Sequence, residues 1–359
     1  MIAIAPHQLA EVNAVGRYIL SALDNHLLPA LIVQALIIEH GLQKAEADQT
    51  CQQIVALMQP APIPPAVMNA TLITASARPA TSTRLTLSFL GFCVDFYSNC
   101  PITLQLLTAL WGDAFTVDST SATATLCIDI IANSTSWHLL RDGELAQTVT
   151  NLPSLKSALM QEVLSALHQT RDWAAVLHAS AVLIDGKLVL LAGQSGSGKT
   201  TLASALIAQG ATFFSDDCVP LRSDTLMACA APGTLGIRPS ALPGLPSVSA
   251  CWQPGKLGGM PGDLRHHTTP QRMTPTREAA ASVLVFPLFM PDATPFIQRL
   301  DASAALRQLL ANGSGIDELT PTNLARWLSW ISTMPAWSIR YAQTAQGVSY
   351  IADILTGSG

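Results

Sequence analysis

The residues with the clearest chemical potential form the segment Gly193-Gln-Ser-Gly-Ser-Gly198-Lys199-Thr200. This segment matches the pattern GxxxxGK[ST] in full, and it lies between an apolar run, LVLLA, and a run of helix formers, TLASALIA. Glycines let a backbone bend so that several N–H groups point at one anion, and the helix that follows adds the positive end of its dipole. The segment therefore predicts a loop that binds the phosphates of a nucleotide.

The side chains of this loop divide the work of binding. Lys199 supplies a mobile cation for the outer phosphates, and Thr200 offers a hydroxyl to Mg²⁺, a hard cation that prefers oxygen ligands. ATP with Mg²⁺ is the expected ligand, although the loop alone does not distinguish ATP from GTP or pyrophosphate. The expected nucleotide-binding residues are Gly193, Ser195, Gly196, Ser197, Gly198, Lys199, Thr200 and Thr201.

Two adjacent carboxylates, Asp216 and Asp217, follow the strand expected at Thr212–Phe214. One of them could hold Mg²⁺ while the other accepts a proton from an attacking hydroxyl. Two aspartates in a turn also serve as a helix cap or an Asx-turn. Their position soon after the phosphate loop favours the catalytic interpretation.

The sequence from Leu177-His-Ala-Ser-Ala181, through the loop, to FFSDDCVPL resembles the HPr kinase/phosphorylase-related kinases. The fold of that family is similar to the nucleotide domain of ATP-dependent phosphoenolpyruvate carboxykinase. The likeness covers about residues 175–222, and it continues weakly through Pro232–Arg238 and Gly255-Lys256. It implies an α/β kinase domain that contains the phosphate loop.

The resemblance also implies roles for single residues. Asp216 would act as the base toward a serine hydroxyl and Asp217 would bind Mg²⁺ with Thr200, although the sequence leaves the two aspartates exchangeable. His178 would lie near the phosphates together with Lys199, or it is a buried structural histidine. Arg238 and Lys256 would neutralise the transferred charge, or they are solvated surface cations.

The chain departs from HPr kinases because the long arginine-rich signature at their C-terminal end is missing, so HPr itself is not the expected substrate. Looser relatives resemble kinases found beside peptide-modifying enzymes, where the target is a serine on a ribosomally made peptide. The helical pattern from Asn13-Ala-Val-Gly16 to Leu57 resembles PqqD-type domains, which capture a leader peptide as an added strand. Only 12 residues precede Asn13, fewer than the family's opening strands would need, so we expect the peptide-binding site to be degraded or to be completed by a later strand near 84–96.

Changes in local pattern divide the chain into four parts. We expect an α/β, multi-domain protein with a small winged-helix-like helical domain at 1–60, a Pro-rich linker at 61–80, a β-rich α+β domain at 81–171 and the kinase domain at 172–359. Three amphipathic helices are expected between 11 and 58. Within the kinase domain we expect a hairpin of two strands, Val176–Leu183 and Leu188–Ala192, that leads into the phosphate loop.

Composition sets the broad class. Of 359 residues, 49% are hydrophobic and 12% are charged, which argues against disorder. The net charge of -5 gives no general attraction to nucleic acid or to an anionic membrane. The seven cysteines are scattered without a CxxC pair, and no signal peptide or membrane span is evident. We therefore expect a cytoplasmic protein with reduced thiols.

The leading hypothesis is an ATP-dependent serine kinase that acts on a peptide or protein. Its partner would be a substrate carrying a serine, without nucleic acid or membrane, and a homo-oligomer is an expectation of the resemblance because related kinases often form rings. One alternative is a nucleotide-gated peptide-binding module that transfers nothing. Another is a small-molecule kinase, with Trp252, Trp327, Trp330 and Trp337 lining a pocket rather than packing in a core.

Overall fold

We analysed a computed structural model of the chain. The structure describes residues 2–5, 8–10, 18–19, 29–40, 42–58, 82–89, 92–111, 115–116, 126–170, 173–231, 233–237, 253–254, 265–268, 278–315 and 320–357. The chain divides into two compact units, one of residues 1–70 with 317–324 and the other of residues 71–316 with 325–359. Within the described ranges, no helix combines the length and apolar character needed to cross a membrane.

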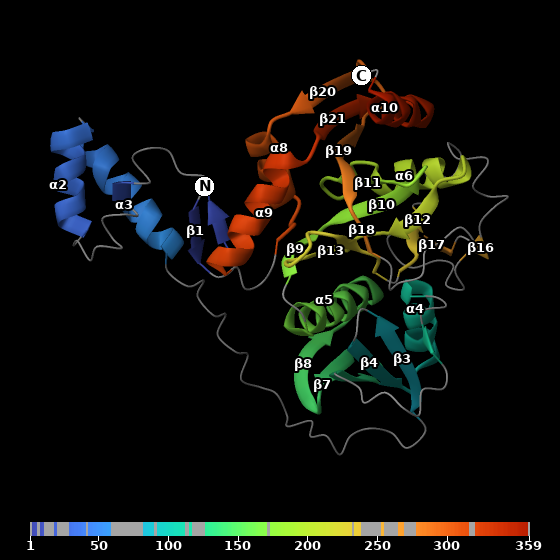
Figure 1. Cartoon of the computed structure of the whole chain (residues 1–359). Coiled ribbons are helices and arrows are strands. Elements are labelled where there is room, and N and C mark those ends of the chain that lie inside the picture. The colour runs from blue at the N-terminus through green and yellow to red at the C-terminus, as the bar shows by residue number, and fades with distance from the viewer. Residues whose placement is uncertain are drawn as a thin grey trace. The chain divides into compact units, whose positions relative to one another are not determined.

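The N-terminal unit contains two helices and a small sheet (Figure 1). Helices α2 (Pro29–His40) and α3 (Lys44–Met58) confirm the second and third expected helices, whereas only residues 18–19 of the first lie within the described part of the chain. Helix α2 is apolar on nearly all sides, whereas the buried residues of α3 recur every three or four positions along one face. The buried core of this unit consists of Ile19, Ile32, Leu36, Ala47, Cys51 and Ile54.

The 12 residues before Asn13 contain two strands that no pattern in the sequence indicated. Strands β1 (Ile2–Ala5) and β2 (Gln8–Ala10) pair in antiparallel orientation. They escape a search for alternation because runs of four and three residues contain too few positions to show a period. The later strand expected to complete the peptide-binding site, β3 (Thr83–Phe89), pairs instead with neighbours inside the other unit.

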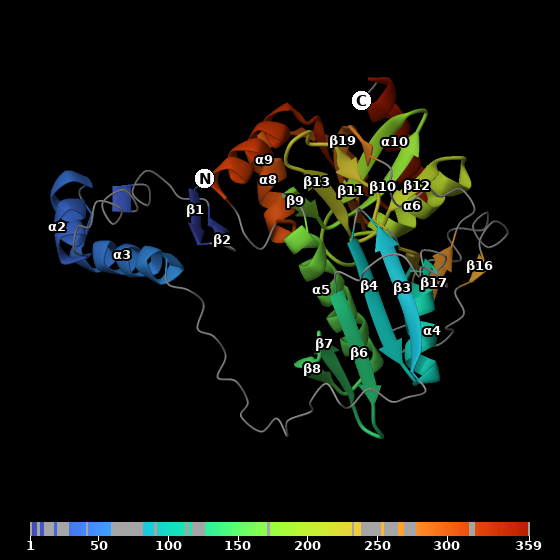
Figure 2. The same ribbon diagram turned by 60° about the horizontal axis from the view of Figure 1, so that its bottom comes forward.

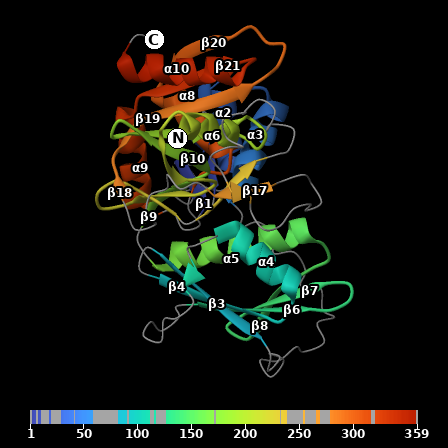
Figure 3. The same cartoon turned by 90° about the vertical axis from the view of Figure 1, so that its right-hand side faces the viewer.

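The β-rich part of the second unit is a six-stranded sheet in the order β5-β3-β4-β6-β7-β8 (Figure 2). Helices α4 (Pro101–Trp111) and α5 (Leu152–Thr170) lie on the same face of this sheet (Figure 3). The remaining strands are β4 (Phe92–Ser98), β5 (Phe115–Thr116), β6 (Leu126–Ala132), β7 (Trp137–Arg141) and β8 (Glu144–Val149).

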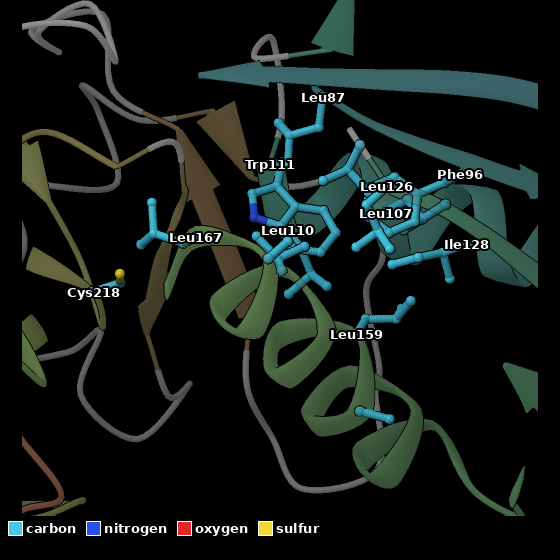
Figure 4. Packing of buried hydrophobic residues seen from close by; sticks show 14 of the residues in the cluster. Leu87, Phe96, Leu107, Leu110, Trp111, Leu126, Ile128, Leu159, Leu167 and Cys218 are labelled. Atoms are coloured by element: carbon cyan, nitrogen blue, oxygen red, sulfur yellow. The ribbon is translucent and has the colours of Figure 1, made fainter. Parts of the chain in front are cut away.

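The core between this sheet and its helices does not stop at residue 171. Trp111 stacks on Phe96 with ring centroids 5.3 Å apart, and the aliphatic side chains of α4, α5 and β6 surround them (Figure 4). The same buried cluster includes Trp173, Val176 and Cys218. The expected β-rich and kinase domains therefore share one hydrophobic core and belong to one compact unit.

The phosphate loop lies at one edge of a second six-stranded sheet, ordered β12-β10-β11-β19-β21-β20. Strand β10 is antiparallel to both β11 and β12, whereas β11, β19 and β21 are parallel. It follows that β11, β12, β19 and β21 all run in the same direction. The strands are β10 (Ala179–Ile184), β11 (Lys187–Ala192), β12 (Thr212–Ser215), β19 (Ala281–Phe289), β20 (Phe296–Leu300) and β21 (Ala336–Tyr341).

Helices cover both faces of this sheet. Helices α6 (Lys199–Ala208) and α10 (Thr344–Thr356) pack on one face, and α8 (Ala302–Ala311) lies on the other (Figure 1 and Figure 2). The inner strands β10, β11 and β19 are apolar over most of their length, as expected where both faces are buried, whereas β20 at the end of the strand order is largely exposed. The structure is thus a mixed α/β protein with several sheets.

The expectation of one continuous strand at Val176–Leu183 was wrong, because the structure has two strands there. The chain leaves β9 (Trp173–Leu177) and enters β10 at Ala179, so that His178 lies at the break. The two halves belong to different sheets, because β9 pairs with β13 (Val219–Arg222) while β10 pairs with β11 and β12. Strands β14 (Ala228–Cys229) and β18 (Glu278–Ala279) complete the sheet of β9.

The elements not yet described are a small three-stranded sheet and helix α9 (Pro321–Thr333). Strand β17 (Arg265–Thr268) pairs with β15 (Leu235–Ile237) and with β16 (Gln253–Pro254). Helix α9 carries Trp327 and Trp330, and both rings are buried. Trp337 packs against the core beside α10. The tryptophans within the described residues therefore pack as core, and Trp252 lies outside those residues.

Candidate functional site

The predicted chemical groups meet at one edge of the β12-β10-β11-β19-β21-β20 sheet. The loop 193–198 follows the carboxyl end of β11, and Asp216 and Asp217 follow the carboxyl end of β12. His178 precedes the antiparallel β10, whose first residue pairs with Ala192 at the same edge. The carboxyl edge of parallel strands is where open α/β sheets bind ligands.

The loop has the strand–loop–helix context that the sequence predicts, with α6 beginning at Lys199. Gly198 has φ of +98°, a conformation that other residues rarely adopt. A Cβ at this position would lie 2.8 Å from the Tyr341 hydroxyl and 3.1 Å from Phe289 Cβ. The backbone thus needs glycine here for its conformation and also for the close approach of β19 and β21.

Lys199 is folded back onto its own loop. Its Nζ donates to the carbonyl oxygens of Gly193 at 2.7 Å and Gln194 at 3.2 Å, and it lies 3.3 Å from His178 Nε2. Burial lowers the pKa of Lys199, against the opposing effect of Asp217 and Asp216. The side chain is a buried cation held at the mouth of the loop, where an anion would meet it.

Asp216 is the most constrained acid in the site. Its carboxylate accepts hydrogen bonds from the Ser180 hydroxyl, from Thr200 Oγ1 at 3.2 Å and from the Gly236 N–H at 3.3 Å. Burial, with a smaller contribution from the adjacent Asp217, raises its pKa to about 7. The carboxylate is therefore fixed against the first turn of α6, where it costs free energy to keep it charged.

Asp217 differs from its neighbour in both exposure and backbone. Its side chain is half-buried, and its φ of +63° is uncommon for a residue other than glycine. Such conformations cluster at functional sites, although aspartate tolerates them better than most residues. The more accessible of the two carboxylates is thus Asp217.

His178 lies between Asp217, which follows β12, and the residues that follow α8. The backbone N–H of His178 donates to Ser314 Oγ at 2.9 Å, and its backbone carbonyl accepts from Asn312 Nδ2 at 3.2 Å. Burial and the nearby Lys199 lower the pKa of its imidazole, against an interaction with Asp217. The ring therefore favours the neutral form beside the lysine.

The donor set fits a nucleotide with a hard divalent cation. Thr200 Oγ1 and the Asp216 carboxylate are neighbouring oxygen groups, which are the ligands that Mg²⁺ prefers. Ser197 Oγ is buried in the loop and has no hydrogen-bond partner among the residues that the structure describes. A buried hydroxyl without a partner is unfavourable, and a phosphate oxygen in the loop would satisfy it.

The structure thus brings together the loop residues, His178, Lys199, Asp216 and Asp217. Ser195 is exposed on the loop, and Thr201 follows in the first turn of α6. Arg238 and Lys256 lie outside the described residues. Linker 61–80 also lies outside them.

Sequence reasoning missed the residues that position the site. Ser180 was visible only as part of the motif around His178, with no signal that its hydroxyl reaches Asp216. Asn312 and Ser314 are more than 130 positions from His178, so no local pattern relates them to it. Gly236 contributes through its backbone, which the identity of a residue does not reveal.

One cavity lies elsewhere. It has a volume of about 440 Å³ and is lined by the end of β20, the end of α9 and the start of β21, including Arg299, Leu300 and Ala336. This is the amino end of β21, opposite the edge that carries the loop. No tryptophan lines this cavity, so it is not the pocket that the small-molecule alternative assigned to the tryptophans.

Comparison with protein-family models gives no match for this sequence, and a search of the curated proteins gives none either. The roles of the residues at this edge therefore rest on their chemistry and geometry.

Proposed function

We propose that the protein is an ATP-dependent kinase that phosphorylates a serine hydroxyl of a peptide or protein. The observation that carries this proposal is the contact between Thr200 Oγ1 and Asp216 at 3.2 Å, beside a second carboxylate that is less buried. A protein that only binds nucleotide needs one carboxylate for the metal. A second, more accessible carboxylate at the same edge favours a protein that also transfers a phosphoryl group.

The geometry favours an assignment opposite to the one implied by the family resemblance. Asp216 touches the loop threonine and is buried, so Thr200 and Asp216 are the residues that would hold Mg²⁺. When bound, Mg²⁺ supplies positive charge next to the phosphates. Asp217 is then the candidate base, because this residue is only half-buried and a serine hydroxyl could approach it.

The chemical step is a transfer of the γ-phosphoryl group. The serine oxygen forms a bond to the γ-phosphorus of ATP, the bond from that phosphorus to the β–γ bridging oxygen breaks, and ADP leaves. Asp217 accepts the proton of the serine hydroxyl. Lys199 and the loop N–H groups hold and neutralise the phosphates, and a neutral His178 beside them adds no further charge.

Recruitment of a peptide is the second part of the proposal. The β1–β2 pair forms a two-stranded sheet, and β1 packs on α3. A strand with an unpaired edge can bind an extended peptide through main-chain hydrogen bonds. We propose that this unit binds the peptide whose serine is phosphorylated.

The test uses intact mass. The protein is incubated with Mg²⁺, ATP and synthetic peptides that each carry one serine, and the same peptides with alanine in that position are the control. Addition of one phosphate to serine peptides alone is the expected result. ATP binding with unchanged mass of every peptide would indicate a nucleotide-gated binding module instead.

A further inference from the structure

Three consecutive large apolar residues, Leu288 (44% exposed), Phe289 and Met290, are exposed where β19 ends. Of these, Phe289 and Met290 are bonded through their backbones to the loop and to β21. Phe289, the last residue of β19, is 40% exposed, and Met290, which follows it, is 44% exposed. Exposed apolar residues that are neighbours, at an edge that carries charged groups, often mark a binding surface. We call Phe289 and Met290 the apolar ledge.

The apolar ledge is attached to the phosphate loop. The N–H of Phe289 donates to the carbonyl of Ser197 at 3.0 Å, and the N–H of Met290 donates to the carbonyl of Tyr341 at 3.0 Å. The Phe289 ring also contacts the Tyr341 ring, with centroids 5.8 Å apart. The backbone of the ledge is thus fixed beside the loop, while its side chains still face solvent in part.

The two sides of the loop differ in chemistry. Strand order places β10 and β12, with Asp216 and Asp217, on one side of β11, and β19 with the apolar ledge on the other. The two ends of a nucleoside triphosphate differ in the same way: its terminal phosphates bind metal, and its base is a flat, largely apolar ring. Phosphates in the loop with their metal at Asp216 would direct the nucleoside toward β19.

We propose that the apolar ledge holds the base of the nucleotide whose phosphates occupy the loop; this rests on the proposed nucleotide binding. Stacking on an aromatic side chain tolerates different bases, because every base has a π-face. The N–H groups of Phe289 and Met290 and the carbonyl of Met290 already have partners in the protein. The ledge therefore recognises a base by contact with its face and distinguishes adenine from guanine only weakly.

The experiment compares ligands with and without a base. Calorimetry measures the dissociation constants of ATP, GTP and inorganic tripolyphosphate, each with Mg²⁺, for the wild type and for Phe289→Ser, Met290→Ser and Ile102→Ser. Ile102 is the matched control, because it is an apolar residue of α4 that is 48% exposed. Tripolyphosphate binding also reports whether each variant keeps a folded loop.

In the wild type, ATP and GTP should bind with similar affinity, and each should bind about tenfold more tightly than tripolyphosphate. Phe289→Ser and Met290→Ser should weaken ATP toward the affinity of tripolyphosphate and leave tripolyphosphate itself unchanged, while Ile102→Ser changes neither. Because Met290→Ser leaves the contact between Phe289 and Tyr341 in place, it keeps the test valid if Phe289→Ser does not fold.

Equal ratios of ATP to tripolyphosphate affinity in the wild type and in both ledge variants would overturn the ledge proposal and leave the phosphate site intact. Loss of peptide phosphorylation or of self-association in those variants, with that ratio unchanged, would overturn it as well and would identify the ledge as a protein-binding surface. If neither ATP nor tripolyphosphate binds the wild type, the proposed function fails together with the ledge.

Discussion

The Thr200 hydroxyl lies 3.2 and 3.3 Å from the two oxygens of the Asp216 carboxylate. This contact joins the first turn of α6 to the end of β12, two elements that meet only because β10 pairs with both β11 and β12. It brings a hydroxyl and a carboxylate together beside a loop built for anions. This arrangement is the basis for the metal-assisted nucleotide site that we propose at this edge.

The first prediction concerns the Thr200 hydroxyl. Thr200→Val removes the hydroxyl and nearly preserves the volume, so the affinity for Mg²⁺ with ATP should fall by about tenfold or more. Thr200→Ser keeps the hydroxyl and should remain close to the wild type. ATP titrations at several Mg²⁺ concentrations measure both, and a Thr200→Val protein with the Mg²⁺ requirement of the wild type would contradict the role of this hydroxyl.

The second prediction separates the two aspartates. Asp216→Asn should lose binding of ATP that depends on Mg²⁺, because a ligand of the metal is gone. Asp217→Asn should keep that binding and slow phosphoryl transfer by about 100-fold or more, because the proton acceptor is lost. Binding by calorimetry and single-turnover transfer measure the two effects, and the reverse pattern would exchange the two roles.

The third prediction concerns pH and stability in the absence of metal. The pKa of Asp216 is about 7 in the folded protein against 3.8 for an ordinary aspartate, so the folded state binds more protons than the unfolded state between these values. The contribution of Asp216 to the free energy of unfolding therefore falls as pH rises through this window. At pH 8 or above, Asp216→Asn should be more stable than the wild type by about 1–3 kcal/mol.

Denaturant unfolding in the presence of a chelator measures this difference. The advantage of the variant should shrink as pH falls from about 7 through 3.8, and it should vanish below about 3, where aspartate is mostly neutral in both states. A wild-type protein that is as stable as Asp216→Asn at high pH would show that burial of this carboxylate has no such cost. A stability gained by losing a functional residue is the usual trade-off at active sites.

The fourth prediction concerns the closeness of Gly198 to Tyr341. Gly198→Ala should destabilise the protein by about 1–3 kcal/mol, because φ is positive and the new Cβ would meet the Tyr341 hydroxyl. Gly196→Ala is the matched control, since φ is also positive but nothing lies within 4 Å of its Cβ position. Gly196→Ala should therefore cost less than Gly198→Ala.

A second substitution locates the cause. The Tyr341 hydroxyl is buried and has no hydrogen-bond partner in the described part of the chain, so Tyr341→Phe alone should be neutral or stabilising. Combined with Gly198→Ala, Tyr341→Phe should recover part of the lost stability in thermal unfolding. Additive effects of the two substitutions would indicate that backbone strain alone, rather than the contact, accounts for the loss.

The sequence predicts those parts of the fold that local pattern determines. The apolar run before Gly193 and the helix formers after Thr200 predict β11 and α6, because residues next to one another in the chain decide both. The hairpin turn at Asp142-Gly143 is likewise local, with both residues at positive φ. The chemical groups of the site follow from the same short segments.

Features that depend on distant partners were missed or misjudged. The break at His178 exists because β9 and β10 join strands in different sheets, and no property of the run Val176–Leu183 distinguishes its two halves. The unequal burial of Asp216 and Asp217 depends on Ser180 and Gly236, which tertiary structure brings to the first carboxylate only. Because these partners are distant in the chain, the sequence alone could not distinguish Asp216 from Asp217.

The most direct test of the central claim is a calorimetric titration of ATP with Mg²⁺ into the wild type, Lys199→Ala and Asp216→Asn. Lys199 contacts the carbonyl of Gly193, and Asp216 contacts Thr200 at the start of α6. Their proposed roles differ: Lys199 is the cation for the phosphates and Asp216 is the ligand for the metal. Saturable binding of one nucleotide per chain that needs Mg²⁺, and that is lost or strongly weakened in both folded variants, is the predicted result. No heat with the wild type, or equal affinity in all three proteins, would contradict the account.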